Sequence, residues 1–346
     1  MDGIRAIDLD DPRDFARWQG FVARRPDAHC TDLAEWRRIF GELYGIRSHN
    51  YAVTRGEEIC GVLSLYHIRS PFLGTMLVTS PFFGYGGLYW DTPATRDALL
   101  ARADELAREL GVDYVELRLR QPLPAPYRTN TDFLEFDVDL PPTVETAWSE
   151  TLGSNARQNV RKSQQHDLSF HLTAEHGPCY RLLCRTLRAH GTPFHGERFF
   201  RQLRRHLSDR VQFAEVRHAG RMVAAAVVLR FRDGILTPYI GSLARSRGLR
   251  ANYYQYWSII EWCCREGVKR FELGRSPRDS THVQFKRKWG GREVPLYYNY
   301  RLIDPRKRYR SVSRPSPAQR LATVIWKRLP LAVTRRVGPA VFRYIP

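Results

Sequence analysis

Residues 271–300 contain the side chains of this chain that are best suited to holding an anion. The stretch reads FELGRSPRDSTHVQFKRKWGGREVPLYYNY. We expect a strand over 268–273 that stops at Gly274, then a charged loop, then a second strand over 294–302. This order would place Arg275, Lys286 and Lys288 around one cleft, where cations can hold an anion or stabilise a developing oxyanion. The alternative is a solvated basic loop between two core strands.

The composition is that of a folded chain with a large positive charge. Its 346 residues suffice for about two domains, and 43% of them are apolar. The net charge of +19 favours polyanionic partners: nucleic acid, anionic lipid or phosphorylated substrates. No apolar run approaches the roughly 20 residues of a membrane span, and the acidic amino terminus lacks the apolar core of a signal peptide. We therefore expect a cytoplasmic protein.

The cysteines and histidines do not have the spacing of a metal site. The six cysteines form no C-x-x-C pair, and the adjacent Cys263 and Cys264 suit neither a metal nor an easy disulfide. His166, His171 and His176 are five residues apart, a spacing that fits neither one helix face nor one strand face. We predict six buried free thiols, no metal and no bound cofactor.

The order of predicted elements is similar in the two halves of the chain. The first half reads as two helices within 1–50, a β-hairpin over 51–68, a stretch rich in glycine and aromatic residues over 69–90, a helix over 94–110, and strands over 112–120 and 133–140. The second half reads as helices over 146–165, 177–190 and 197–206, strands over 211–218, 222–231 and 235–240, a helix over 252–266 and the strand over 268–273.

Matching segments indicate an internal duplication. Residues 111–117 (GVDYVEL) resemble residues 267–273 (GVKRFEL), and each follows a helix. The repeated unit predicts an α/β (α+β) fold with a mixed sheet flanked by helices. We place one domain at 1–142, a second at 143–302, and a basic tail at 303–346.

In such units a ligand binds where strands end and a helix begins. In the first half that place is the glycine-rich turn with Tyr85 and Gly86, although ordinary turn chemistry explains it equally well. In the second half it lies between Ser242 and Asn252. Tyr239 precedes this place on the same strand. These residues are candidates for substrate binding.

Short motifs follow one another in a characteristic order along the chain. They are LVTSPF at 77–82, YGG at 85–87, ELR at 116–118, NVRK at 159–162, GTP at 191–193, FELGRS at 271–276 and FKRKWG at 285–290. Together they closely resemble the FemAB-like transferases, which are built from tandem domains of the GNAT acyltransferase fold. The likeness extends over nearly the whole chain and is strongest to the branch associated with PEP-CTERM/exosortase systems.

The resemblance implies transfer of an aminoacyl group from charged tRNA to an amine, usually on a peptidoglycan precursor. It implies that the two GNAT-like halves hold the acceptor and the donor, the second half being BioF2-like. Lys286 would be the lysine of the family's F-K-x-x-[FW]-G motif, which takes part in donor handling and catalysis. The PEP-CTERM branch carries an association with exopolysaccharide or the cell envelope.

The residue types agree with this chemistry. Aminolysis needs a neutral amine, an oxyanion stabiliser and placement of both partners, and Lys286 with Arg275 can stabilise an oxyanion or hold donor phosphates. Phe285 and Trp289 can stack on a base or acyl group, or simply pack the core. Glu272 is a candidate general base. The remaining candidates for substrate binding are Ser276, Gly290, Arg157, Arg161 and Lys162, the last three on a basic helical segment that is otherwise a solvated face.

The chain departs from acetyl-CoA enzymes at the pyrophosphate loop. Those enzymes carry R/Q-x-x-G-x-G/A at a helix start, whereas this chain has Arg245, Gly248 and then Arg250 in place of the small residue. A large side chain there would obstruct close approach of the backbone to a pyrophosphate.

The tail has the pattern of a basic amphipathic helix. Leu321, Val324, Ile325 and Leu329 can share one face, which would rest either on an anionic membrane or on the protein itself. A membrane contact would place the protein at the inner face of the membrane.

Three hypotheses follow. The first is a FemAB-like transferase that forms an amide on an envelope or exopolysaccharide precursor, with aminoacyl-tRNA as the donor. The second is an acyl-CoA-dependent N-acyltransferase of the same fold. The third is a non-catalytic module that binds RNA or another polyanion.

Overall fold

The computed structural model describes residues 3–311, 313 and 316–346, and the chain forms two compact units. The first comprises Met1–Phe133, Pro295–Arg314 and Arg343–Pro346; the second comprises Leu134–Val294 and Pro315–Phe342. These units divide the chain inside predicted strands, whereas the domains expected from sequence join at 142/143 and 302/303. The helices of the predicted tail belong to the second unit.

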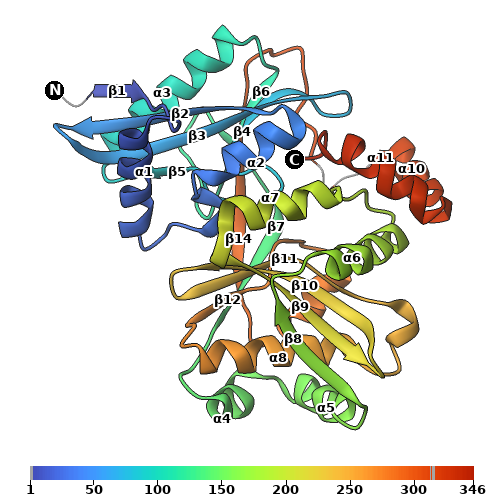
Figure 1. Cartoon of the computed structure of the whole chain (residues 1–346). Coiled ribbons are helices and arrows are strands. Elements are labelled where there is room, and N and C mark those ends of the chain that lie inside the picture. Colours follow the sequence, from blue (N-terminus) through green and yellow to red (C-terminus); the bar gives the residue numbers. More distant parts are fainter. Residues whose placement is uncertain (1–2, 312, 314–315) are drawn as a thin grey trace. The chain divides into compact units, whose positions relative to one another are not determined.

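The first unit is built on a sheet with helices packed against it. Its elements are β1 (Gly3–Ala6), α1 (Pro12–Arg24), the 3-10 turn η1 (Cys30–Asp32), α2 (Glu35–Tyr44), β2 (Arg47–Arg55), β3 (Glu58–Ser70), β4 (Gly74–Val78), β5 (Leu88–Trp90), α3 (Pro93–Glu109), β6 (Tyr114–Leu119) and most of β14 (Arg292–Leu302). Figure 1 labels these elements.

The second unit holds the remaining elements, including the far end of β7 (Arg128–Asp139). They are α4 (Val144–Thr146), a π-helical turn (Ala147–Thr151), α5 (Ser154–Ser163), β8 (Leu168–Thr173), α6 (Gly177–His190), α7 (Glu197–Leu207), η3 (Ser208–Arg210), β9 (Val211–His218), β10 (Arg221–Phe231), β11 (Gly234–Ser242), η4 (Ala244–Ser246), α8 (Ala251–Arg265), β12 (Arg270–Glu272), β13 (Ser276–Pro277), α9 (Thr281–Arg287), α10 (Pro317–Arg328) and α11 (Leu331–Phe342).

Both sheets have the same order and the same strand directions. In the first unit β1, β2, β3 and β4 pair antiparallel in sequence, β6 pairs parallel to β4, and β14 pairs antiparallel to β6. In the second unit β8, β9, β10 and β11 do the same, β12 is parallel to β11, and β7 is antiparallel to β12. The predicted mixed α/β fold is therefore confirmed, and the repeat in the sequence corresponds to a repeat in topology.

The last strand of each sheet comes from the other half of the sequence. β7 precedes the second half of the chain but completes the second unit's sheet, and β14 returns to complete the first. Neither exchange is visible in the local sequence pattern.

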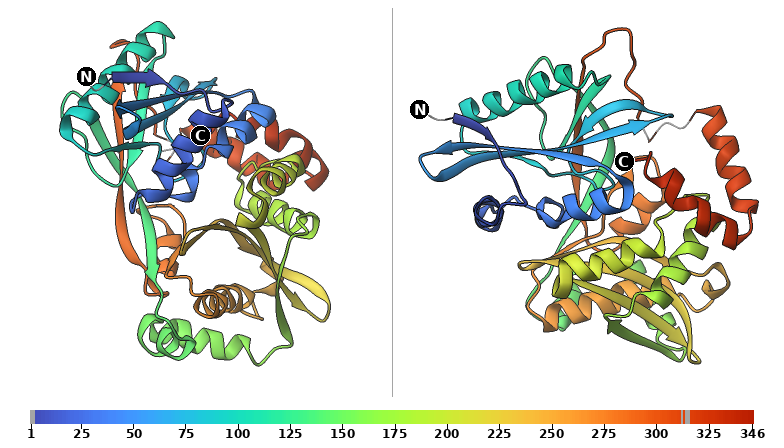
Figure 2. Two further views of the ribbon diagram at one scale, coloured as in Figure 1. Left: turned by 60° about the vertical axis from the view of Figure 1, so that its left-hand side comes forward. Right: turned by 45° about the horizontal axis from the view of Figure 1, so that its top comes forward.

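Helices cover both faces of the second unit's sheet. Helices α6 and α7 pack on one face and α8 on the other (Figures 1 and 2). The core between α8 and the sheet includes Ile259, Phe271 and Trp289, each wholly buried. Burying side chains of this size stabilises a fold by about 2 kcal/mol each, so these residues hold α8 firmly against the sheet.

Three local predictions were wrong. The predicted helix 146–165 breaks at Gly153, whose N–H donates to the Lys288 carbonyl at 3.1 Å; a Cβ there would crowd that same oxygen. The charged loop predicted after Gly274 contains the helix α9. Strands β1 and β8 were not predicted. The residues of β1 are mostly exposed, so β1 lacks the apolar pattern of a buried strand, whereas β8 (LSFHLT) alternates apolar and polar residues and was overlooked.

The cysteine prediction is confirmed: all six are free and buried. Within the described part of the chain, no helix has the length and apolarity needed to cross a membrane.

Candidate functional site

The second unit's sheet opens where β11 and β12 separate. These parallel strands pair only from Gly234 with Arg270 to Leu236 with Glu272, after which β12 ends and β11 continues to Ser242. The chain leaves β12 through Gly274, which has a φ of 78°. A gap between parallel strands exposes backbone groups that a ligand or a side chain can bind.

Lys286 lies at this opening. Its ammonium group donates to the carbonyl of Gly274 and, at 3.4 Å, to that of Arg275. It also lies 5.6 Å from the centre of the Phe136 ring, on β7. The side chain is almost wholly buried, with 7% of the residue exposed. Helix α9 therefore holds a lysine that is fixed in place instead of being solvated.

The environment of Lys286 favours loss of its proton. Burial lowers the pKa of Lys286 to about 8, because a charged amine is poorly solvated in the interior; the nearby Glu135 charge opposes this shift. At neutral pH most of the lysine remains protonated and can donate hydrogen bonds. A buried lysine whose pKa approaches neutrality is a common feature of reactive sites.

The lowered pKa makes a testable prediction about stability. Between pH 8 and 10.5 the unfolded chain keeps a proton on this lysine that the folded chain has released, so the wild type gains stability as pH rises. Lys286→Met lacks this gain. We expect the stability of the variant relative to wild type to fall by up to about 3 kcal/mol from pH 7 to pH 10.

Urea unfolding, followed by tryptophan fluorescence at several pH values, measures this difference. Lys162→Met removes an exposed lysine on α5 and is the matched control. If the difference in unfolding free energy between wild type and Lys286→Met stayed constant with pH, the lowered pKa of Lys286 would be contradicted.

A cavity of about 700 Å³ lies beside α9 in the same unit. Its walls come from α6, the end of β11, the loop 243–250, the first turns of α8, and α9. The residues that line it include Arg185, His190, Ser242, Arg245, Arg247, Arg250, Asn252, Tyr253, Gln255, Thr281, His282 and Phe285. This volume is within the range of small-molecule sites.

The cavity is cationic. Four arginines line it and no acidic residue does. Burial and the charges of Lys327 and Arg247 lower the pKa of His190, while burial and the charges of Lys286 and His190 lower that of His282. Both imidazoles are thus neutral at pH 7. Lys286 follows Phe285 on α9 and stands one helical turn after His282, and both of these residues line the cavity, so the lysine's helix forms part of its wall. The cavity is suited to an anionic ligand.

Gln255 is a candidate that the sequence reasoning missed. It is wholly buried, lines the cavity, and neither its amide nitrogen nor its amide oxygen has a hydrogen-bond partner among the described residues. An unpaired buried amide is costly unless a ligand or water satisfies it. Its signal in the sequence is a lone amide in the otherwise apolar stretch YYQYWSII.

The residues of the F-K-x-x-W-G motif have different surroundings. Phe285 lines the cavity, whereas Trp289 is wholly buried and stacks on Tyr256 with ring centres 5.1 Å apart. Gly290 has a φ of 72°, and a Cβ there would collide with the Thr151 carbonyl. Of Phe285, Trp289 and Gly290, only Phe285 lines the cavity, where it can contact a ligand.

The other residues predicted around Lys286 line the strand ends. Glu272 is buried at the end of β12, 3.7 Å from Arg270 of the same strand. Ser276 is buried in β13, which pairs with β7. Arg275 is half-buried and presents its carbonyl, not its guanidinium, to Lys286.

Tyr239 forms a polar pair with His195. Its hydroxyl lies 2.5 Å from His195 Nε2. Burial holds the pKa of His195 well below its ordinary value, and burial raises that of Tyr239 against the opposing charge of Arg275. Both groups are therefore neutral at pH 7, so the tyrosine hydroxyl keeps its proton.

The basic helix α5 makes mainly structural contacts through Arg157. One guanidinium nitrogen of Arg157 donates to the carbonyls of Trp148, Ser149 and Leu152, which closes the π-helical turn. Arg161 lies over the Trp148 ring, and Lys162 is exposed. None of the three is among the residues that line the cavity.

Arg250 stands at the start of α8 with a φ of 52°, the left-handed region that favours glycine. Its guanidinium donates to Asn159 Oδ1 at 2.5 Å. The side chain is therefore tied to α5 while still lining the cavity. In the loop that corresponds to the pyrophosphate loop of acetyl-CoA enzymes, the position of the small residue is taken here by an arginine whose side chain is held by Asn159.

In the first unit, Tyr85 and Gly86 are packed by the protein itself. Gly86 has a φ of 124°, and a Cβ there would lie 2.6 Å from a carboxylate oxygen of Asp32. The same carboxylate accepts from the Gly87 N–H at 2.7 Å and from the Tyr89 hydroxyl at 2.6 Å. Asp32 thus fills the place where the sequence analysis expected a ligand.

Residues 154–287 match the protein family described as "Acetyltransferase (GNAT) domain". This segment runs from the start of α5 to the end of α9 and contains all the residues that line the cavity, together with Lys286. A comparison with curated proteins found no matching sequence.

Solved structures share the architecture at low sequence identity. FemX is 12% identical, with a TM-score of 0.64 over 86% of this chain and 96% of its own. A tandem GNAT protein from the clavulanic acid biosynthesis pathway is 12% identical, with a TM-score of 0.57 over 88% and 99%. L-PGS from Bacillus licheniformis is 13% identical, with a TM-score of 0.53 over 96% and 98%. The chain therefore has a fold similar to that of FemX and of tandem GNAT proteins, and its residues 154–287 match the model of the GNAT acetyltransferase domain.

Proposed function

We propose that this chain is a transferase that moves an acyl or aminoacyl group from an anionic donor to an amine. The observation that carries the proposal is the arginine-lined cavity of the second unit with the buried Lys286 beside it. The cavity would hold the donor's phosphates, and Gln255 and Phe285 would contact the group near the reacting carbonyl.

The chemistry is aminolysis. The neutral amine of the acceptor attacks the donor's ester carbonyl, forming a new C–N bond and a tetrahedral oxyanion. The ammonium of Lys286 would donate to that oxygen. Collapse of the intermediate breaks the C–O ester bond, and the amine's proton passes to the departing hydroxyl. Gly274, whose carbonyl binds the ammonium, would act as a positioning residue for Lys286.

Aminoacyl-tRNA is the donor that we favour. The cavity has four arginines, and Arg250 occupies the place of the small residue in the pyrophosphate loop. The phosphates at the end of a tRNA chain can bind these arginines. The pyrophosphate of an acyl-CoA needs close approach of the protein backbone, which the Arg250 side chain impedes. The resemblance to FemAB-like transferases favours the same donor, and an acceptor on an envelope or exopolysaccharide precursor; the PEP-CTERM association remains a prediction.

A donor experiment tests the proposal. Purified protein receives an acceptor extract with labelled total aminoacyl-tRNA in one reaction and labelled acyl-CoAs in another. Label transferred from tRNA supports the first hypothesis, and label transferred from acyl-CoA supports the N-acyltransferase. Salt-dependent RNA binding without transfer from either donor would indicate a binding module.

The carboxyl-terminal helices support a contact with an anionic membrane. One side of each packs on its own unit, where Thr323 of α10 meets Gly191 and Gly338 of α11 meets Phe194. On α10 the residues Leu321, Val324 and Ile325 remain 62%, 46% and 52% exposed. Residues 317–342 carry five basic side chains and no acidic one. An apolar face bordered by cations is typical of helices that lie on anionic lipid.

Leu321→Glu with Ile325→Glu should weaken binding to phosphatidylglycerol vesicles by at least about 30-fold, since burying each side chain is worth about 2 kcal/mol and the new charges are repelled. Vesicle co-sedimentation measures the effect. Ala16→Glu with Ala101→Glu, at exposed positions of the first unit, is the control of equal charge. Equal weakening in both variants would show a general charge effect and contradict a specific contact.

A further inference from the structure

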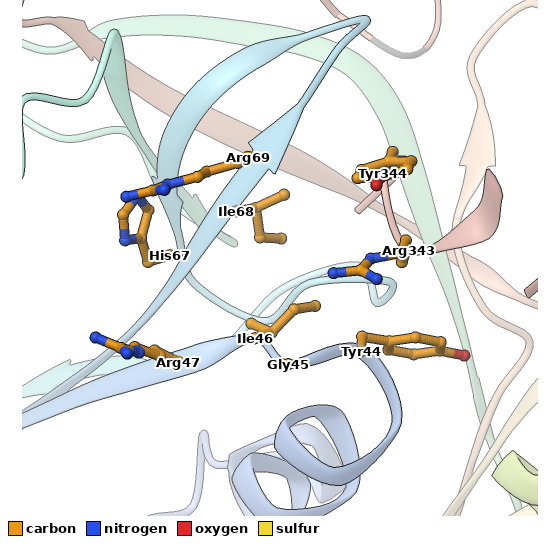
Figure 3. Close-up of a pocket in the computed structure, with 9 residues that line it drawn as sticks. All are labelled: Tyr44, Gly45, Ile46, Arg47, His67, Ile68, Arg69, Arg343 and Tyr344. Carbon is orange, nitrogen blue, oxygen red and sulfur yellow. The ribbon is translucent and has the colours of Figure 1, made fainter. Parts of the chain in front are cut away.

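The first unit contains a second cavity, away from any residue assigned above. It has a volume of about 290 Å³ and lies where α2 ends and β2 begins, beside the end of β3. The last residues of the chain close it. Figure 3 shows the nine residues that line it: Tyr44, Gly45, Ile46, Arg47, His67, Ile68, Arg69, Arg343 and Tyr344.

Three arginines around this cavity lack a carboxylate partner. Arg47 and Arg69 project from the ends of β2 and β3, and Arg343 follows α11. Within the described ranges none of the three forms an ion pair or a side-chain hydrogen bond, although most arginines of the first unit's other surfaces do, as Arg37 does with Asp10. No acidic residue lines the cavity. Their charges are therefore available to a ligand.

His67 provides an independent indication of a polar ligand. It pairs with Arg47 in the β2–β3 register, and its Nε2 is buried without a hydrogen-bond partner among the described residues. Burial, and then the charges of Arg69, His49 and Arg47, lower the pKa of His67. Arg47 lies opposite His67 in this register, and Arg69 follows two residues later on the same face of β3. The neutral imidazole is left with an unsatisfied nitrogen between these arginines.

The cavity has a cationic side and an aromatic side. In Figure 3, Arg47, His67 and Arg69 lie on one side and Tyr44 and Tyr344 on the other, with Ile46 and Ile68 between them; Arg343 lies beside the tyrosines and points its guanidinium toward the middle. Arg343 also lies over the Tyr344 ring, with its guanidinium carbon 5.2 Å from the ring centre. Guanidinium groups bind phosphate oxygens in pairs, and the tyrosines offer a surface to an organic group.

We propose that this cavity binds a phosphate or diphosphate group attached to a small organic group. Arg47, Arg69 and Arg343 bind the phosphate oxygens, His67 Nε2–H donates to one of them, and the two tyrosines contact the organic part. A soluble phosphate ester and a phospholipid headgroup share this chemistry. The inference does not depend on the transfer reaction proposed for the second unit.

Equilibrium binding of pyrophosphate to the full chain, at fixed ionic strength, tests the site. Every protein in this experiment carries Arg185→Gln with Arg247→Gln, so that the second unit's cavity contributes little to the measured pyrophosphate binding. In this background Arg47→Gln with Arg69→Gln should weaken pyrophosphate binding at least tenfold. Arg13→Gln with Arg221→Gln, which removes two exposed arginines elsewhere, should leave it unchanged. Equal weakening by both pairs would overturn the proposal.

Two further measurements identify the source of the phosphate and guard against misfolding. Tighter binding of ADP than of pyrophosphate would support a soluble ester, and binding only to phosphatidic acid vesicles would support a headgroup. If Arg47→Gln with Arg69→Gln weakened only the binding of tRNA, the proposal would be overturned. In the unmutated chain, pyrophosphate should protect Arg69 from phenylglyoxal, as read by mass spectrometry of its peptide. Unprotected Arg69 would contradict the site.

Discussion

Lys286→Ala is expected to reduce kcat for transfer by about 10²- to 10³-fold, the usual effect of removing one donor to a developing oxyanion. The ammonium is held by the carbonyls of Gly274 and Arg275 at the opening between β11 and β12, and alanine leaves that position empty. The variant should still fold, because Trp289 and Phe271 keep the core around α9 packed. Near-normal kcat in a folded variant would overturn the assignment.

The pH dependence of kcat/KM separates a chemical role from a structural one. If the protonated lysine donates the hydrogen bond, activity should fall above pH 8, where the buried amine loses its proton. Lys286→Arg should not restore activity, since a guanidinium differs from an ammonium in shape and stays charged. Lys269→Ala, which removes a lysine that is 77% exposed, should have normal activity. A wild-type profile that keeps rising through pH 9 would contradict this role.

Arg185→Gln with Arg247→Gln should raise KM for the donor by at least about 100-fold and leave kcat nearly unchanged. Both side chains line the cavity that lacks acidic residues, and each hydrogen bond to a charged group is worth about 1.5–3 kcal/mol. If the donor is tRNA, the plot of the logarithm of the binding constant against the logarithm of the salt concentration should also become less steep. Its slope should fall by roughly one for each phosphate that an arginine no longer neutralises.

Steady-state kinetics at varied donor and salt measure both effects. Arg13→Gln with Arg221→Gln removes the same charge from exposed positions and is the control. A fall in kcat at saturating donor, with KM unchanged, would indicate that the arginines act elsewhere in the reaction.

Much of the fold could be predicted from the sequence because the pattern is local. The predicted helix 177–190 corresponds to α6, and the strand over 211–218 to β9, since each has a clear apolar period and a glycine or turn at its end. The break at Gly153 could not be predicted in this way. It depends on the Lys288 carbonyl, which lies 135 positions further along the chain.

The site could be predicted only in part, because some of its residues come together only through contacts between distant parts of the sequence. Lys286 and Phe285 were found through a motif, and Ser242 and Asn252 through the strand-to-helix transition. Arg185, His190 and Gln255 were missed, because α6 and α8 reach the cavity only in the folded unit. The burial that shifts the pKa of Lys286 arises from Phe136 and the strand ends, which no spacing rule brings together.

The kind of bond in the product shows whether this chain is an amide-forming transferase. Protein, labelled aminoacyl-tRNA and acceptor extract are incubated, and the product is treated with mild base, which cleaves esters but spares amides. We expect a labelled product that survives base, forms with wild type and Lys269→Ala, and is absent with Lys286→Ala. Label that stays on tRNA, or a base-stable product formed equally well by Lys286→Ala, would contradict it.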